Sequence, residues 1–167
     1  MAEPGAAARM IHASIAELAQ ALAPRRRLLG LDVGSKTIGL AISDSDLRVA
    51  AALDTVRRTK FTQDAEALAR LIAEREVGGL VIGLPVGMDG SEGPAAQSVR
   101  QFAANLAAKL DPQLAIGIAF WDERLSTSAV QRLLVDEADM SRRRRAEVVD
   151  KMAATYILQG ALDSLRR

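Results

Sequence analysis

The sequence predicts an α/β domain built on a mixed sheet of five strands with helices on both faces. Three observations lead to this prediction. Five short apolar runs are spread along the chain, helical patterns separate the later ones, and a short glycine-containing turn joins the first two. The runs are continuously apolar rather than alternating, which is typical of a sheet that is covered on both sides.

The first three strands are expected to form an antiparallel meander. Residues 28–32 and 37–42 are apolar runs joined by the turn at 33–36, a pattern typical of a hairpin. Residues 47–53 predict a third strand, which continues the meander.

The rest of the chain alternates helices and strands. In order, the expected elements are a helix over 62–76, a strand over 79–84, a helix over 94–110, a strand over 114–121, a short helix over 126–134 and a last helix over 147–165. The stretch 79–121 has the length of a parallel crossover unit. The polar residues 136–145 are expected to be a mobile connection before the last helix.

Length and hydropathy predict one domain. The chain has 167 residues, enough for one core, with residues 26–167 forming the domain and residues 1–25 an N-terminal extension. The extension is expected to be a short amphipathic helix or a loose segment. No stretch approaches the roughly 20 apolar residues that cross a bilayer, and the extension lacks the pattern of a signal peptide. We therefore expect a cytoplasmic protein without membrane contact.

Composition limits the chemistry. There is no cysteine and His12 is the only histidine, so thiolate chemistry, zinc–thiolate sites and His-based triads are excluded. Aromatic residues are 3% of the chain, which argues against an aromatic platform for stacking bases. The net charge is +1, so a site for a polyanion must come from a local cluster. Acid–base or metal chemistry must fall to carboxylates.

Two carboxylates stand at predicted strand ends. Asp32 closes the first strand and Glu123 follows the last one. Sites in open α/β sheets gather outside the carboxyl ends of the strands, so these side chains converge if the two strands are close. The alternative is that each acid ends its strand and faces water. Asp32 fits that alternative less well because it lies within an otherwise apolar run.

Asp150 is the third candidate. At helical spacing it shares a stripe with Ala154, Ile157 and Ala161, so the carboxylate falls on the apolar face, in the expected first turn of the last helix. The alternative is that Asp150 caps the helix or interacts favourably with the helix dipole. Three converging carboxylates without histidine or cysteine suit Mg²⁺ or Mn²⁺. Metal-assisted hydrolysis of a phosphodiester is the corresponding reaction class.

Four sequence blocks resemble the YqgF/RuvX family. They are LDVGSKTIGLA (31–41), VIGLP with MDGSE (81–85 and 88–92), DERLST (122–127) and DKMAA with ILQ (150–154 and 157–159). They follow the family's order and span roughly residues 28–165. The sequence departs from the family at Gly87, where asparagine is common.

The resemblance implies an RNase H-like fold related to Holliday junction resolvases of the RuvC type. It implies a nuclease that matures the 5′ end of 16S rRNA from its precursor. It also carries over Asp32, Glu123 and Asp150 as the metal-binding, catalytic acids. In a two-metal site we expect Asp32 to bridge the ions, with Glu123 and Asp150 each holding one side. Asp122 could take the place of Glu123, but adjacent residues of an extended segment face opposite sides, so we expect only one of the two to face the site.

Basic residues near these acids are candidates for binding nucleic acid. Lys36 in the hairpin turn is one candidate, and the alternative is that it is an ordinary solvated lysine. Arg124 is another, and the alternative is that it forms an ion pair with Asp122 or another acid. The glycine-rich loop 87–93 offers backbone N–H groups to a phosphate, or is a plain connection. The strongest cluster is a run of four arginines, expected to bind backbone phosphates without sequence preference: Arg142, Arg143, Arg144 and Arg145.

Several functions remain open at this point. The same site would serve cleavage of pre-16S rRNA or resolution of branched DNA in recombination and repair. A third alternative is a non-catalytic assembly factor that binds rRNA or ribosomal particles. The Asp-Val-Gly-Ser turn also resembles the phosphate motif of the actin-like ATPases, but those enclose a nucleotide between two such domains. The chain is expected to be a monomer or a homodimer, and a resolvase of symmetrical junctions would need two active sites.

Overall fold

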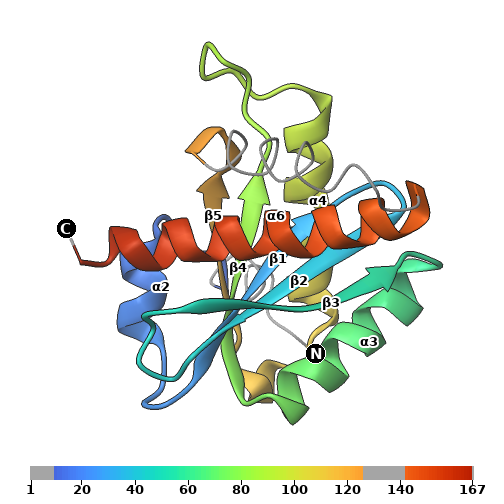
Figure 1. Ribbon diagram of the computed structural model, residues 1–167. Helices are drawn as coiled ribbons and strands as arrows, with labels where there is room; N and C mark the ends of the chain where they lie inside the picture. The colour runs from blue at the N-terminus through green and yellow to red at the C-terminus, as the bar shows by residue number, and fades with distance from the viewer. Residues whose placement is uncertain (1–9, 126–141, 167) are drawn as a thin grey trace.

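The computed structural model describes residues 10–125 and 142–166 and contains a five-stranded mixed sheet (Figure 1). Its strand order is β3-β2-β1-β4-β5. The strands are β1 (Arg27–Val33), β2 (Thr37–Ser43), β3 (Ala50–Arg57), β4 (Val77–Leu84) and β5 (Gly117–Asp122).

The pairing directions bring three strand ends to one edge. β1 and β2 pair antiparallel, as do β2 and β3, which confirms the predicted meander. β4 pairs parallel with both β1 and β5, which confirms the predicted crossover unit. The carboxyl ends of β1, β4 and β5 therefore lie at the same edge of the sheet.

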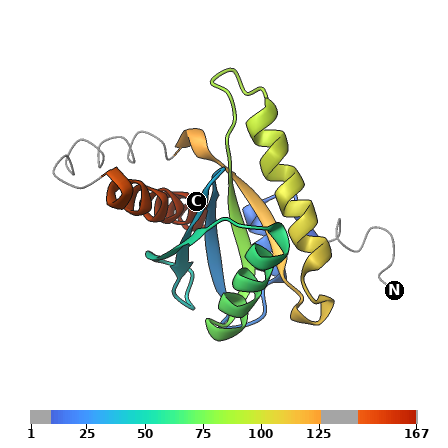
Figure 2. The ribbon, with the colours of Figure 1, turned by 90° about the vertical axis from the view of Figure 1, so that its right-hand side faces the viewer.

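Helices cover both faces of the sheet, as predicted. The described helices are α2 (Ile15–Ala21), α3 (Phe61–Glu74), α4 (Pro94–Lys109) and α6 (Arg142–Ser164). Figure 2 shows α6 on one face and α3 with α4 on the other. None of the helices in the described ranges is long and apolar enough to span a membrane.

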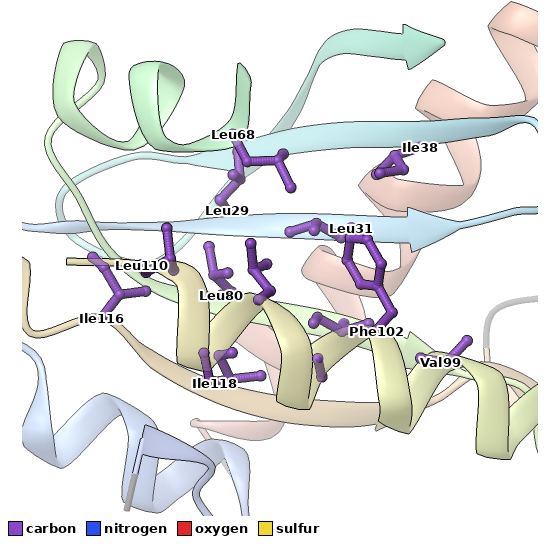
Figure 3. Close-up of a cluster of buried hydrophobic side chains, with 14 of the residues drawn as sticks. Leu29, Leu31, Ile38, Leu68, Leu80, Val99, Phe102, Leu110, Ile116 and Ile118 are labelled. Atoms are coloured by element: carbon purple, nitrogen blue, oxygen red, sulfur yellow. The ribbon is translucent and has the colours of Figure 1, made fainter. Parts of the chain in front are cut away.

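Each face has its own apolar core. The core under α3 and α4 includes Leu29, Leu31, Leu80 and Ile118, with Phe102 as its only fully packed aromatic ring (Figure 3). The other core joins β1, β4 and β5 to α2 and α6. Leucine, isoleucine, valine and alanine fill both, as the low aromatic content requires.

The N-terminal segment from residue 10 packs against the edge strand β5. Ile11 forms a parallel bridge with Ile118, and the His12 N–H donates to the Ile118 carbonyl at 2.7 Å. Ser14 caps α2 by accepting from the Glu17 N–H. Ile15 and Leu18 are buried in the α6-side core, so this segment adds apolar contacts to the sheet.

Two strands begin later than the sequence pattern predicts, and local turns explain both differences. β3 starts at Ala50 because the Asp44 carboxylate accepts from the Arg48 and Val49 N–H groups and closes a turn. β5 starts at Gly117 because a short 3-10 turn, Pro112–Leu114, precedes it. The Asp111 side chain caps that turn.

The start of the last helix was predicted wrongly. α6 begins at Arg142, so residues 142–145 belong to the helix and not to a connection, and Asp150 lies in its third turn rather than its first. Arginine is a good helix former, so a polar run of this composition extends a helix without an apolar stripe. The short helix predicted over 126–134 lies outside the described residues.

The path of α6 follows from its contacts. At its carboxyl end, the Arg166 side chain donates to the Leu47 carbonyl beside the β2–β3 turn. Further back, a Cβ placed on Gly30 would lie 2.8 Å from the Leu158 Cβ and 3.0 Å from the Ala154 carbonyl oxygen. The helix thus packs directly on the backbone of β1, and its amino-terminal half heads toward the carboxyl end of that strand.

Candidate active site

Two carboxylates meet at the carboxyl edge of the sheet. Asp32 is the penultimate residue of β1, and Glu123 follows β5 directly in a 3-10 turn, Glu123–Leu125. Strand β4 separates their backbones, yet the two side chains share a hydrogen bond. Asp32 is two residues after Gly30, so it lies on the face of β1 that α6 covers.

Gly83 of β4 provides the passage between them. A Cβ on this residue would lie 2.7 Å from Oε1 and 3.0 Å from Cγ of Glu123. It would also lie 2.5 Å from Cδ1 of Ile157 in α6. The Glu123 side chain therefore rests on the bare backbone of β4, with α6 close above. Sequence reasoning missed this residue, although a glycine inside a strand is a known signal of close approach.

The pair has unusual electrostatics. Burial raises the pKa of Glu123 from 4.5 to about 7, and the charge and hydrogen bond of Asp32 add to the rise, with a further contribution from Asp122. The hydrogen bond requires one proton between the two carboxyl groups. A cation at the same place would remove that requirement, because it would let both groups ionise.

Asp150 approaches the same edge through α6. It lies one helical turn before Ala154, whose carbonyl oxygen stands over Gly30. Because the amino-terminal half of α6 points toward the carboxyl end of β1, the turn that carries Asp150 lies beyond Ala154 in the direction of Asp32. The side chain of Asp150 is outside the described part of the structure, and among the described side chains no group of three potential metal ligands occurs.

Asp122 and Glu123 point to different sides, as alternation along an extended segment predicts. The Asp122 carboxylate forms an ion pair with Arg124, with Nη2 and Oδ2 at 2.6 Å. Arg124 lowers the pKa of Asp122 through this hydrogen-bonded contact. Nη1 of Arg124 is 3.4 Å from the Gly87 carbonyl and 3.5 Å from the Met88 carbonyl. The predicted ion-pair alternative for Arg124 is therefore present, and its contact with a phosphate stays a prediction.

The hairpin turn after Asp32 is held by Arg58, which sequence reasoning also missed. Its Nη1 donates to the Gly34 carbonyl at 2.6 Å, and its backbone N–H donates to the Lys36 carbonyl at 2.8 Å. The guanidinium lies 5.3 Å from the ring centre of Phe102 and 3.9 Å from the buried carboxylate of Asp64. Lys36 itself is exposed at the turn, where its contact with a phosphate stays a prediction.

The glycine-rich loop after β4 uses several of its amides internally. The Gly87 N–H donates to the Ser91 carbonyl, and the Gly90 N–H donates to the Gly87 carbonyl, both at 2.8 Å. The Asp89 carboxylate accepts from the N–H and the hydroxyl of Ser91, which lowers its pKa. These three amides are therefore not directed at a phosphate, and the loop is shaped by its own hydrogen bonds.

Comparison with solved structures shows which fold the chain has. The chain superposes on Thermus thermophilus RuvC bound to a Holliday junction with a TM-score of 0.52 and 13% identity, covering 83% of this chain and 94% of that one. It superposes on the fowlpox virus resolvase bound to junction DNA with a TM-score of 0.52 and 9% identity, covering 84% and 99%. The chain thus has the RNase H-like fold of the resolvases.

The family follows from sequence. The model of the RuvX family, described as Holliday junction resolvase, matches residues 26–164, and the chain belongs to this family. A relative from Paramagnetospirillum magneticum is 65% identical over 149 residues, covering 89% of this chain and 93% of its own. One from Rhodospirillum centenum is 60% identical over 158 residues, covering 92% and 82%. Both are named "Putative pre-16S rRNA nuclease". Fold and family together indicate a hydrolase that acts on nucleic acids.

Proposed function

We propose that the protein is a divalent-metal-dependent nuclease that hydrolyses phosphodiesters at the 5′ end of precursor 16S rRNA during ribosome assembly in the cytoplasm. The observation that carries the proposal is the contact between Asp32 and Glu123 on the bare backbone of Gly83. The names of the relatives support rRNA as the substrate.

The carboxylates fit Mg²⁺ or Mn²⁺. Asp32 and Glu123 offer hard oxygen ligands within hydrogen-bonding distance of each other. Burial and the negative charge of Asp32 raise the pKa of Glu123, and a bound cation would oppose that rise. Asp32 lies on the central strand and would bridge two ions, with Glu123 and Asp150 on either side. When bound, such ions supply positive charge to the scissile phosphate and acidity to the attacking water.

Residues around the acidic pair would position the substrate. Glu123 lies directly on the backbone of Gly83, where Ile157 of α6 also packs, and this contact positions its carboxylate. Arg58 fixes the turn that carries Lys36, which would contact the phosphate backbone. The arginines Arg142, Arg143, Arg144 and Arg145 at the start of α6 would hold the strand by its phosphates. The side chains of those four arginines lie outside the described part of the structure.

A second candidate function is resolution of Holliday junctions. The family description and the two superposed resolvases favour it. The chemistry would be the same, but symmetrical cutting of a junction requires two active sites and so a homodimer. Cleavage of precursor rRNA would work with a monomer.

The test is a cleavage assay with Mg²⁺ or Mn²⁺ on a 5′-extended 16S rRNA fragment and on a four-way DNA junction. Each substrate is given to the wild type and to Asp32→Asn. We expect the wild type to cut the RNA at one site and the variant to leave it intact. Symmetrical, Asp32-dependent cutting of the junction alone would replace rRNA with branched DNA as the substrate. Binding of RNA without any cutting would favour a non-catalytic assembly factor.

A further inference from the structure

A pocket of about 560 Å³ lies on the opposite side of the sheet edge from the acidic pair. Leu84 and Phe120 form part of its lining on the α4 face of β4 and β5. The charged side chains that line it come from two places in the sequence. They are Glu92, Arg100, Asp122 and Arg124.

Arg100 presents a fixed planar surface in this pocket. Its Nε and Nη2 donate to the two carboxylate oxygens of Glu92 at 2.6 and 2.8 Å, which is the bidentate geometry. Its guanidinium carbon lies 4.9 Å from the ring centre of Phe120. With 47% of the side chain exposed, the guanidinium is held by partners on one edge and one face, and stays accessible.

The charges of the pocket are balanced. Glu92 pairs with Arg100, and Asp122 pairs with Arg124, so the two guanidiniums are already neutralised by carboxylates. The electrostatic attraction of a phosphate to this pocket would be weak, because each cation has an anion beside it. A flat, uncharged heterocycle with hydrogen-bonding edges suits the combination of an apolar lining, a planar guanidinium and polar walls. Bases of nucleic acids stack on arginine planes in this way.

The pocket is close to the acidic pair along the chain. Asp122 and Arg124 line it, and Glu123 lies between them, so about 4 Å of backbone separates each wall residue from the site. A strand that crosses the end of β5 would therefore place a phosphate by Glu123 and a neighbouring base on the α4 side. Composition argued against an aromatic platform, and here a guanidinium supplies the plane instead.

We propose that this pocket binds one unstacked nucleobase of the substrate strand, in the nucleotide next to the phosphate that the Asp32–Glu123 pair would cleave. The inference rests on the proposed nuclease function for its substrate. Arg100 stacks on the base through the face of its guanidinium that Phe120 leaves open. The His12 ring takes no part in this contact, because it lies over Gly117 beside Leu18, on the α6 side of β5.

The experiment measures binding of 5′-extended 16S RNA to Asp32→Asn protein, which prevents cleavage. A single abasic nucleotide is moved through each position around the cut site. We expect one position at which the abasic change weakens binding about tenfold. Arg100→Lys, which keeps the charge and loses the plane, should weaken binding of intact RNA by a similar factor. At that one position the two changes should not add, because both remove the same contact.

Arg70→Lys is the matched control, because Arg70 is exposed on α3 and does not line the pocket. It should bind every RNA as the parent does. Thermal unfolding of all variants checks that each is folded.

Additive effects of Arg100→Lys and the abasic change at every position would overturn the proposal. So would binding of free nucleoside monophosphates that depends on Arg100 while RNA binding does not, since the pocket would then hold a free nucleotide. The parallel cleavage assay separates this inference from the function on which it rests. Non-additive effects of Arg100→Lys and the abasic change (coupling), without any Asp32-dependent cleavage, would mean that the proposed nuclease function is wrong and that the base pocket is real. Cleavage without coupling would mean that the pocket alone fails.

Discussion

Gly83→Ala tests the geometry of the acidic pair with a single methyl group. The new Cβ would lie 2.7 Å from Oε1 of Glu123 and 2.5 Å from Cδ1 of Ile157. Normal carbon contacts begin near about 3.5 Å, so the carboxylate must move by about 0.8 Å or α6 must lift. Overpacking of this kind costs about 1–3 kcal/mol of the free energy of unfolding.

The effect on catalysis should be larger than the effect on stability. A displacement of about 1 Å in a reacting group lowers rates by about 10²-fold. We therefore expect Gly83→Ala to remain folded at 25 °C, to bind Mg²⁺ more weakly and to cleave RNA about 10²-fold more slowly than the wild type. Urea unfolding, calorimetric titration with Mg²⁺ and single-turnover cleavage measure the three quantities.

Gly93→Ala is the matched control. Gly93 caps α4, has a φ of −91° and would place a Cβ with no atom within 4 Å. Its replacement should cost less than about 1 kcal/mol of stability and leave the rate unchanged. Wild-type cleavage and wild-type Mg²⁺ affinity in Gly83→Ala would refute the reasoning, because the carboxylate would then not rest on β4.

Three further predictions concern proton binding, the hairpin turn and the arginine run. In metal-free protein the raised pKa of Glu123 means that the folded state holds more protons than the unfolded state between pH 4.5 and about 7. The free energy of unfolding should therefore fall as pH rises through this range. The fall should be about 1–2 kcal/mol, since water screens a partly exposed group, and a slope unchanged in Glu123→Gln during urea unfolding with EDTA would contradict it. Arg58→Met removes the bond to the Gly34 carbonyl and should lower the cleavage rate about tenfold with little change in RNA affinity, whereas an unchanged rate would show that the turn needs no such support. Replacing residues 142–145 by serine should weaken RNA binding and flatten its dependence on salt, and an unchanged salt slope in a binding titration would exclude them from the interface.

The sequence alone could predict the sheet and much of the acidic pair. Continuous apolar runs and one tight turn were sufficient for the meander and the crossover, because these features depend on local spacing. Asp32 and Glu123 were candidates because strand ends converge at one edge in such sheets. Their contact across β4 depended on the order of strands, which local patterns do not encode.

Other features depend on residues far apart in the sequence. Arg58 donates a hydrogen bond to the Gly34 carbonyl, 24 positions earlier, and its guanidinium lies over the ring of Phe102 in α4. No local sequence pattern indicates this role. The position of the Arg100 guanidinium depends on the ring of Phe120 in β5, which is distant in the sequence. The start of α6 differs from the prediction because residues 142–145 lack an apolar stripe, although arginine favours helix.

The central claim is that Asp32 and Glu123 act together on a divalent ion to cleave the substrate. The most direct measurement is the single-turnover cleavage rate of a 5′-extended 16S rRNA fragment by wild type, Asp32→Asn and Glu123→Gln over a range of Mg²⁺ concentrations, with RNA affinity measured in parallel. We expect a rate that depends on Mg²⁺ and falls by at least about 10²-fold in each variant, with affinity for RNA retained. Cleavage that persists in EDTA, or that both variants perform at the wild-type rate, would contradict it.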